Sequence, residues 1–266
     1  MDVVLGDNEF SLFQKLIYDT AGIHMSAAKK TLVSGRLAKR VKQFGLATYS
    51  EYFHLINSPG HEQEKQMAVN LLTTNETSFF REAKHFDFLI QSVLPKWKPG
   101  EVRRIWSAAS STGEEAYTTA MVMAEHAGQI NWEIVGTDIS TQVLDKARTG
   151  HYSMDRANNI PTRYLHSYCL KGIGRQHGSF LVSKILRDRV HFTHANLKSD
   201  LTALGEFDVI FLRNVLIYFD MPTKQLVVSQ LVRQLKAGGY LLIGHSESLN
   251  GVTDAVYSVQ PAVYRK

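Results

Sequence analysis

Cysteine is almost absent from this sequence, since Cys169 is the only one among 266 residues. A single thiol forms no intrachain disulfide, and without clustered Cys and His at ligand spacings we expect no metal site. No run of about 18 apolar residues occurs, so we expect no membrane insertion. The first ten residues carry three acids and no base, unlike a secretory signal peptide. We therefore expect a soluble cytoplasmic protein.

Acidic residues are missing from one long window, residues 20–50, which contains six Lys and Arg. The chain has a formal net charge of +5, so the rest of it, with 24 basic and 25 acidic side chains, sums to −1. A near-neutral body with one basic element favours a local acidic partner over a general affinity for nucleic acid.

Apolar residues at helical spacing extend from residue 8 to about residue 93. They predict two helices before a third that begins with a capping box of Thr48 and Glu51. Two further helices are expected over 62–72 and 84–93. The sequence therefore predicts a small helical domain over residues 1–94.

Strands and helices alternate beyond the Pro- and Gly-containing linker at 95–100. This alternation predicts a doubly wound α/β fold with a parallel sheet over residues 95–266. A pair of short strands is expected around Pro261. The stretch 150–188 is too long for an ordinary connection and is predicted to be an inserted subdomain. The expected strands cover 102–108, 132–138, 189–195, 207–214 and 239–246, and the helices 113–127, 140–148 and 223–235.

A glycine-rich dinucleotide motif is also lacking in the loop after the first strand, residues 107–117. In such sheets this loop is usually among the first to contact a ligand. Its helix begins with Glu114 and Glu115, which would repel a pyrophosphate but suit a ligand with a cationic group and ribose hydroxyls. The alternative is that these acids only complement the helix dipole.

Asp138 ends the second strand, about 25 residues after Gly113. An acid at this place accepts hydrogen bonds from both ribose hydroxyls. The competing interpretation is a helix cap, because the helix over 140–148 follows directly. An acidic first loop followed by an acid after the second strand favours S-adenosylmethionine over NAD.

Two further segments combine polar and aromatic residues. Residues 75–82, NETSFFRE, place polar side chains around an aromatic pair just before the linker, and they form either a ligand-covering segment or a capped helix start with a core Phe pair. Residues 207–219 form a strand that ends in Arg213 and Asn214, with Tyr218 one helical turn later. These are either site residues or, alternatively, a surface cation and a packing tyrosine.

With five motifs in order, the sequence resembles the CheR family of S-adenosylmethionine-dependent methyltransferases, which esterify glutamates on chemotaxis receptors. The motifs are NETSFFRE, WSAASSTGEEAY, GTDIS, FLRNVLIYFD and GYLLIGHSESL, and the resemblance covers the chain from about residue 10 to its end. Ser110 and Ala116 depart from the residues that many members carry, and the stretch 150–188 takes the place of the family's small β subdomain. The resemblance implies a cofactor site made of Asn75, Thr77, Arg81, Glu115, Asp138, Asn196, Leu197, Arg213 and Asn214.

Methyl transfer to a carboxylate needs no general base, because a glutamate with a pKa near 4.3 is already ionised at pH 7. Alignment and exclusion of water are then the main sources of rate. We expect Arg81 and Tyr218 to line the transfer site as the catalytic residues.

The basic window has a second interpretation in this context. Four of its six cations fall within about 100° of one helix face, which taken alone is most often a solvated surface. Methyl-accepting receptor helices are rich in Glu, so the resemblance implies electrostatic docking on their cytoplasmic helices. The predicted receptor-binding residues are Lys29, Arg36, Lys39 and Arg40.

Two rival functions remain possible at this point. A nucleic-acid methyltransferase is suggested by the pI of 9.2, but the proline-containing motif that grips base amines is missing after the strand at 207–214. A non-enzymatic adapter that binds the cofactor is the second rival. We expect a monomer that binds no nucleic acid.

Overall fold

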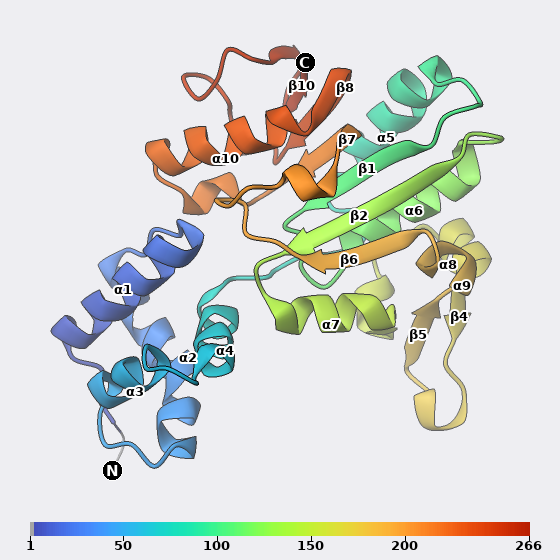
Figure 1. Ribbon diagram of the computed structural model, residues 1–266. Coiled ribbons are helices and arrows are strands. Elements are labelled where there is room, and N and C mark those ends of the chain that lie inside the picture. The colour runs from blue at the N-terminus through green and yellow to red at the C-terminus, as the bar shows by residue number, and fades with distance from the viewer. Residues whose placement is uncertain (1–2) are drawn as a thin grey trace.

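The computed structural model describes residues 3–266 and divides into a helical part and a sheet part (Figure 1). Four of the five helices that the apolar spacing predicted form the N-terminal part. Phe13, Leu37 and Tyr52, from three of them, are completely buried in one core. The four helices are α1 (Asp7–Ala21), α2 (Lys30–Gln43), α3 (Tyr49–Ile56) and α4 (Glu62–Leu72).

The cap expected at Thr48 is confirmed at the start of α3, but the Glu51 half of the capping box is shifted by one residue. The Thr48 hydroxyl accepts the backbone N–H of Glu51, whereas the Glu51 carboxylate accepts the N–H of Ala47 instead of that of Thr48. The Thr48 contact satisfies a donor at the helix start that would otherwise lack a partner. Local sequence alone therefore places this helix correctly.

The helix expected over 84–93 packs with the sheet part and not with the N-terminal bundle. The chain forms α5 (Lys84–Phe88), a π-helical turn η2 (Leu89–Val93) and a 3-10 turn η3 (Leu94–Lys96). Phe86, Leu89 and Val93 pack into the core beneath the sheet. Helical periodicity shows which face is apolar but not which core that face enters.

The main sheet has seven strands in the order β6-β2-β1-β7-β8-β10-β9. Its first five are parallel, whereas β10 runs antiparallel to β8 and to β9, so the sheet is mixed rather than all parallel. The pair of short strands expected around Pro261 is confirmed as β9 and β10. The strands are β1 (Arg103–Ala108), β2 (Trp132–Asp138), β6 (Val190–His194), β7 (Phe207–Leu212), β8 (Leu235–Ile243), β9 (Tyr257–Gln260) and β10 (Val263–Arg265).

Both faces of the sheet are covered, because alternate side chains of its central strands enter different cores. Ile105 of β1 packs with helix α6 (Glu114–His126) and with the segment 84–94, whereas Trp106 packs with helix α10 (Met221–Arg233). Helix α7 (Thr141–Thr149) follows β2 and contacts both β2 and β6. This two-sided burial explains the nearly continuous apolar runs of the central strands.

The stretch 150–188 forms the expected inserted subdomain. It contains a separate antiparallel sheet in the order β3-β5-β4, which extends away from the main sheet (Figure 1). Two short helices that the sequence did not predict lie beside these strands. The elements are β3 (His151–Ser153), α8 (Thr162–Tyr168), β4 (Cys169–Lys171), β5 (Ser179–Val182) and α9 (Lys184–Arg187).

Over residues 3–266, none of the helices has the length and apolar character needed to cross a bilayer.

Candidate functional site

A pocket lies where the carboxyl ends of the parallel strands face the N-terminal helices. The arrowheads of β2 and β6 point toward these helices in Figure 1, and strand order reverses between β1 and β7, where such folds bind ligands. The empty space, part of it open to solvent, is about 1160 Å³. Every residue predicted for the cofactor or for catalysis lines it: Asn75, Thr77, Arg81, Glu115, Asp138, Asn196, Leu197, Arg213, Asn214 and Tyr218.

The loop after β1 bends tightly around this pocket. Ala109 and Ser111 adopt left-handed φ angles of +69° and +50°, a strained conformation that clusters at functional sites. Gly113 has φ +93°, and a Cβ added there would lie 2.9 Å from the Cβ of Ala147. The small residues of this loop thus bring its backbone to the pocket edge and allow the turn into α6.

Asp138 is buried at the end of β2, with one carboxylate oxygen bound by each of two backbone amides. Oδ2 accepts the N–H of Ser111 and Oδ1 that of Ser140, both at 2.9 Å. Burial raises the pKa of Asp138, whereas these amides lower it. The start of α7 is capped instead by Asn70 of α4, whose Oδ1 accepts the Thr141 N–H at 3.0 Å. The ribose role of Asp138 stays a prediction, but capping of α7 does not explain this residue.

The two acids at the start of α6 point to different places. Glu114 is completely buried and forms an ion pair with Arg156 of the inserted subdomain. Glu115 faces the pocket, where its carboxylate accepts the Ser107 hydroxyl at 2.6 Å and Arg213 Nη1 at 3.1 Å. Burial raises the pKa of Glu115, although Arg213 lowers it. One acid therefore serves the fold, and the other offers an anionic group to a ligand.

Arg213 follows β7, and its side chain is only 2% exposed. Besides Glu115, it donates to Glu82 Oε2 from Nη2 and Nε at 3.2 and 3.3 Å, and to the carbonyl of Arg81. Asn214 has a left-handed φ of +57°, and its N–H is held by Glu247 at 2.9 Å. Arg213 thus contributes mainly by holding its neighbours in place.

The segment 75–82 lines the pocket and also contributes an aromatic pair to the core, but it does not begin a capped helix, because α5 starts at Lys84 without a side-chain cap. Phe79 is completely buried, and Phe80 packs against Phe86. Residues 75–78 and Arg81 line the pocket, and the carbonyl of Asn75 accepts the hydroxyl of Ser111 at 2.7 Å. Arg81 Nη1 donates to the carbonyl of Glu76 at 3.1 Å.

Asn196 joins the end of β6 to the N-terminal part. Its side-chain amide donates to the carbonyl of Thr20 at 2.6 Å, and its Oδ1 accepts the N–H of Lys198 at 3.0 Å. This side chain therefore stabilises the turn that follows β6. Asn196 and Leu197 still line the pocket, so contact with an adenine remains a prediction.

Tyr218 lies at the pocket margin, where the two parts of the chain meet. His24 donates its N–H to the Tyr218 carbonyl at 2.8 Å, and Lys29 Nζ lies 5.3 Å from the centre of the Tyr218 ring. Burial and Glu76 raise the pKa of Tyr218, whereas Arg81 and Arg36 lower it, and the net shift is upward. The hydroxyl is therefore protonated at neutral pH.

The four cations predicted to bind a receptor have different environments. Arg40 forms an ion pair with the buried Glu64, and Arg36 donates to the carbonyls of Leu72 and Thr73 at 3.3 and 2.8 Å. These two arginines hold the bundle together, and their binding to a receptor stays a prediction. Lys39 is exposed, and Lys29 lines the pocket.

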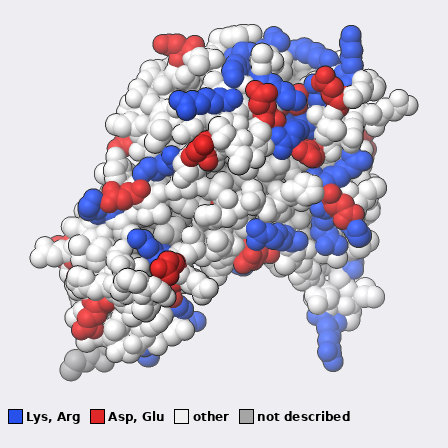
Figure 2. Space-filling model, viewed as in Figure 1, with Lys and Arg blue, Asp and Glu red and all other residues white. Residues whose placement is uncertain are grey.

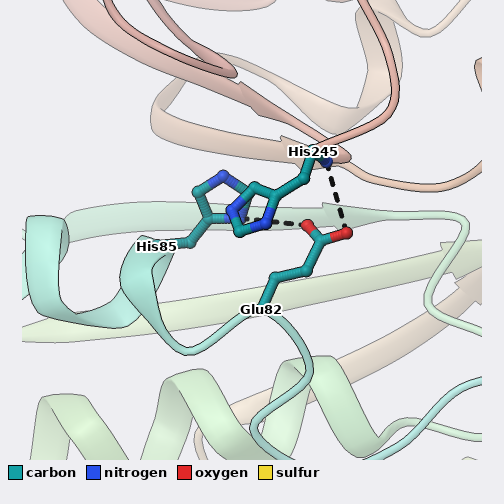
Figure 3. A group of neighbouring side chains, drawn as sticks. All are labelled: Glu82, His85 and His245. Atoms are coloured by element: carbon teal, nitrogen blue, oxygen red, sulfur yellow. Dashed lines mark hydrogen bonds and ion pairs between the residues drawn. The ribbon is translucent and has the colours of Figure 1, made fainter.

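Glu82, His85 and His245 meet beside Arg213 (Figure 3). His85 Nδ1 lies 3.5 Å from Glu82 Oε2, and burial together with Arg213 lowers the pKa of His85 to about 4. Both Glu82 oxygens already accept hydrogen bonds, from Arg213 on one side and from Asn214 and the His245 N–H on the other. A metal ion here would face the Arg213 guanidinium, so we assign no metal to this group.

Sequence reasoning missed the polar contacts that hold the pocket together from outside. Asn70 and Gln66 of α4 bind Thr141 and the carbonyl of Ile139 beside Asp138. Their spacing of four residues on one helix was a signal, because it places both amides on one polar face. Glu82 belongs to the NETSFFRE motif, but its hydrogen-bond partners Arg213, Asn214 and His245 lie more than 130 residues further along the chain.

Comparison with known proteins supports the family resemblance. Residues 75–264 match the family described as "CheR methyltransferase, SAM binding domain", and residues 8–73 match "CheR methyltransferase, all-alpha domain". The matches to these two domains meet near residue 74, so α5 falls within the SAM binding domain, as its packing against the sheet also indicates.

Curated relatives match nearly the whole chain. A "Chemotaxis protein methyltransferase" of Escherichia coli is 40% identical, with 93% of this chain and 87% of the relative covered. A "Chemotaxis protein methyltransferase 2" of Pseudomonas aeruginosa is 39% identical (96% and 92% covered), and a relative from Borreliella burgdorferi is 38% identical (100% and 96% covered). The chain therefore belongs to the CheR methyltransferase family and is an S-adenosylmethionine-dependent methyltransferase.

Proposed function

We propose that this protein transfers a methyl group to the side-chain carboxylates of specific glutamates on methyl-accepting chemotaxis receptors. The curated relatives are named chemotaxis protein methyltransferases, and the receptors are the substrates that such names imply. The proposal also places the domain boundary near residue 74 and keeps the protein monomeric and cytoplasmic.

The distribution of charge within the pocket carries this proposal. Glu115 at the start of α6 and Asp138 at the end of β2 lie on the sheet side of the pocket. Lys29 and Arg81, together with Glu76, come from the N-terminal side, and Arg213 and Tyr218 follow β7. Acids attract the cationic parts and the hydroxyls of the cofactor, whereas cations and a hydroxyl donor attract an anionic acceptor. The same pocket therefore suits a cationic methyl donor and a carboxylate acceptor together.

When bound, S-adenosylmethionine supplies an electrophilic methyl group on its sulfonium sulfur. Glu115 would bind the ammonium group of its amino-acid part and Asp138 the ribose hydroxyls, with Asn75 and Thr77 covering them. Asn196 and Leu197 would flank the adenine.

The acceptor glutamate is already ionised at pH 7, so the protein has only to align it and to exclude water. Arg81 would orient the acceptor carboxylate by charge. The protonated Tyr218 hydroxyl would donate a hydrogen bond to it.

The receptor helix would approach across the margin formed by α2 and the loop after β7. Lys29 and the exposed Lys39 carry charges suited to an acidic helix, and Leu32, which lines the pocket and is 41% exposed, lies on the same side of the pocket. This docking face is smaller than the sequence suggested, because it leaves out Arg36 and Arg40.

A nucleic-acid substrate receives no support from the face of the molecule shown in Figure 2. Acidic and basic side chains are interspersed on the face shown in Figure 2 rather than gathered into a basic track. A cofactor-binding adapter is also not favoured, since the relatives are named as methyltransferases.

Tandem mass spectrometry of a receptor incubated with the protein and S-adenosylmethionine tests the proposal. We expect the added methyl groups on glutamate side chains of the cytoplasmic region, and none after incubation with the Arg81→Ala variant. Methylation of lysine, arginine or nucleic acid would contradict the proposal, and an unmodified receptor would leave the adapter as the better explanation.

A further inference from the structure

We propose that Glu82 is a positioning residue that holds Arg81 in place at the methyl-transfer site. Only the kcat measurements that test this inference rest on the proposed function. Arg81 lines the pocket, whereas among the described residues Glu82 is not part of the lining. Two consecutive side chains thus point to opposite sides of the segment, one toward the ligand and one into the protein.

The Glu82 carboxylate joins three separate parts of the chain. Its Oε2 accepts Nη2 and Nε of Arg213, which follows β7, and its Oε1 accepts the Asn214 side-chain amide at 3.2 Å. Oε1 also accepts the backbone N–H of His245, which follows β8, at 3.2 Å. Glu82 therefore fastens the covering segment 75–82 to the ends of two central strands.

The backbone around Arg81 is held by two further hydrogen bonds. The Arg81 carbonyl accepts Arg213 Nη2, the same nitrogen that binds Glu82, so one guanidinium holds two consecutive residues. On the other side, the N–H of Phe80 donates to the Thr118 hydroxyl of α6 at 3.1 Å. The backbone on either side of Arg81 is thus attached to α6 through Phe80 and to the end of β7 through Glu82.

The backbone of this bend is strained, which is why it needs an anchor. Phe80 and Glu82 have left-handed φ angles of +53° and +54°, which side-chain-bearing residues other than Asn and Asp rarely adopt. Such conformations persist where the surroundings over-determine them. Loss of the Glu82 carboxylate removes the side-chain contacts that hold residue 82 in this conformation, so the bend that carries Arg81 is held less firmly.

Charge matters as well as hydrogen bonding. Arg213 and the donors from Asn214 and His245 hold the pKa of Glu82 below its usual range despite its burial. The carboxylate thus shares Arg213 with Glu115. His85 is buried beside Glu82 with both ring nitrogens unpaired in the described part of the chain, and in its neutral form it does not compete with Arg213 for this carboxylate.

Glu82→Gln tests the inference, with Glu133→Gln as the matched control. Glu133 also pairs with an arginine, Arg104, at 2.5 Å, but this pair lies near the amino ends of β1 and β2, away from the pocket. We expect Glu82→Gln to lower kcat about tenfold, because a buried guanidinium loses one of its two charged partners. Glu82→Asp keeps the charge and recovers part of this loss, and Glu133→Gln stays within about twofold of the parent.

A double-mutant cycle separates positioning from general destabilisation. If Glu82 acts through Arg81, its substitution costs less kcat in an Arg81→Lys background, and the combined loss is smaller than the product of the single losses. Multiplicative losses, or a Glu82→Gln variant as active as Glu133→Gln, would overturn the inference.

Thermal unfolding and calorimetry of S-adenosylmethionine binding, both without receptor, complete the test. We expect Glu82→Gln to bind the cofactor more weakly than Glu133→Gln while unfolding cooperatively. Because this readout needs no acceptor, it stays informative if receptors prove not to be the substrate. Unchanged cofactor affinity together with unchanged kcat would count against the inference and leave the proposed function untouched.

Discussion

Replacing Arg40 by alanine distinguishes a structural arginine from a receptor-docking one. Arg40 Nε donates to Glu64 Oε1 at 2.8 Å, and its Nη2 pairs with Oε2. Glu64 is only 8% exposed, and the Tyr52 hydroxyl donates to it at 2.6 Å. Arg40→Ala leaves this carboxylate buried in the bundle with the tyrosine hydroxyl as its remaining side-chain donor.

The cost follows from this burial. Removing one partner of a fully buried ion pair costs about 3–5 kcal/mol. The Arg40 side chain is 19% exposed, so water replaces part of the lost interaction, and we expect about 2–3 kcal/mol. For a chain of this size each kcal/mol lowers Tm by about 2–4 °C, which gives a decrease of roughly 5–10 °C.

Thermal unfolding of the cofactor-free protein measures this effect, with Lys39→Ala as the control. Lys39 is exposed on the same helix, and we expect its loss to change the free energy of unfolding by less than about 0.5 kcal/mol. Receptor methylation by Arg40→Ala, assayed well below its Tm, should stay near the parent rate. An unchanged Tm with a large loss of receptor methylation would refute this reasoning and restore Arg40 to the docking face.

Three further predictions concern the pocket and its support. Arg81→Ala should lose nearly all turnover and Tyr218→Phe should lower kcat more than cofactor affinity, as steady-state kinetics and calorimetry would show; near-normal turnover in both would remove their assignment. Asn70→Ala removes the hydrogen bond from Thr141 at the start of α7 and should lower the free energy of unfolding, measured with denaturant, by about 1 kcal/mol. An unchanged free energy of unfolding would mean that this cap does not stabilise the protein. His85 has a folded-state pKa of about 4 against a usual 6.5, so the unfolded state takes up a proton at a higher pH than the folded state does. The free energy of unfolding should therefore fall by up to roughly 3 kcal/mol as the pH is lowered from 6.5 to 4. A pH dependence of unfolding that is unaltered in His85→Gln would contradict that origin.

Strand positions were predictable because each central strand is a short apolar run that ends in a polar residue. The strand expected over 132–138 matches β2 exactly in its bounds, and Asp138 at its end lies in the pocket. Burial on both faces of the sheet leaves a signal within six or seven consecutive residues. The pocket residues at strand ends were therefore accessible to sequence reasoning.

Partners distant in the sequence were not predictable in this way. Arg36 and Arg40 have the same sequence signature as Lys39, a cation on a helix without nearby acids. Glu64, the partner of Arg40, lies 24 residues further along, on another helix. Whether a cation is free or paired depends on how two helices pack, and no local pattern records that.

The position of α5 shows the same limit at the level of domains. Its apolar spacing resembles that of the four helices before it, yet Phe86 and Leu89 enter the core beneath the sheet. The segment 75–82 that precedes it crosses from one part to the other and contributes Arg81 to the pocket. The connection between the two parts is thus itself a wall of the site.

Alkaline lability of the transferred methyl group tests the central claim most directly. The protein is incubated with receptor-containing membranes and S-adenosylmethionine labelled in its methyl group, and the washed, labelled receptor is then treated with mild alkali. Methyl esters of glutamate predict release of the label as volatile methanol. A label on the receptor that survives alkali, or a receptor that takes up no label, would contradict the claim that this protein is a glutamate O-methyltransferase.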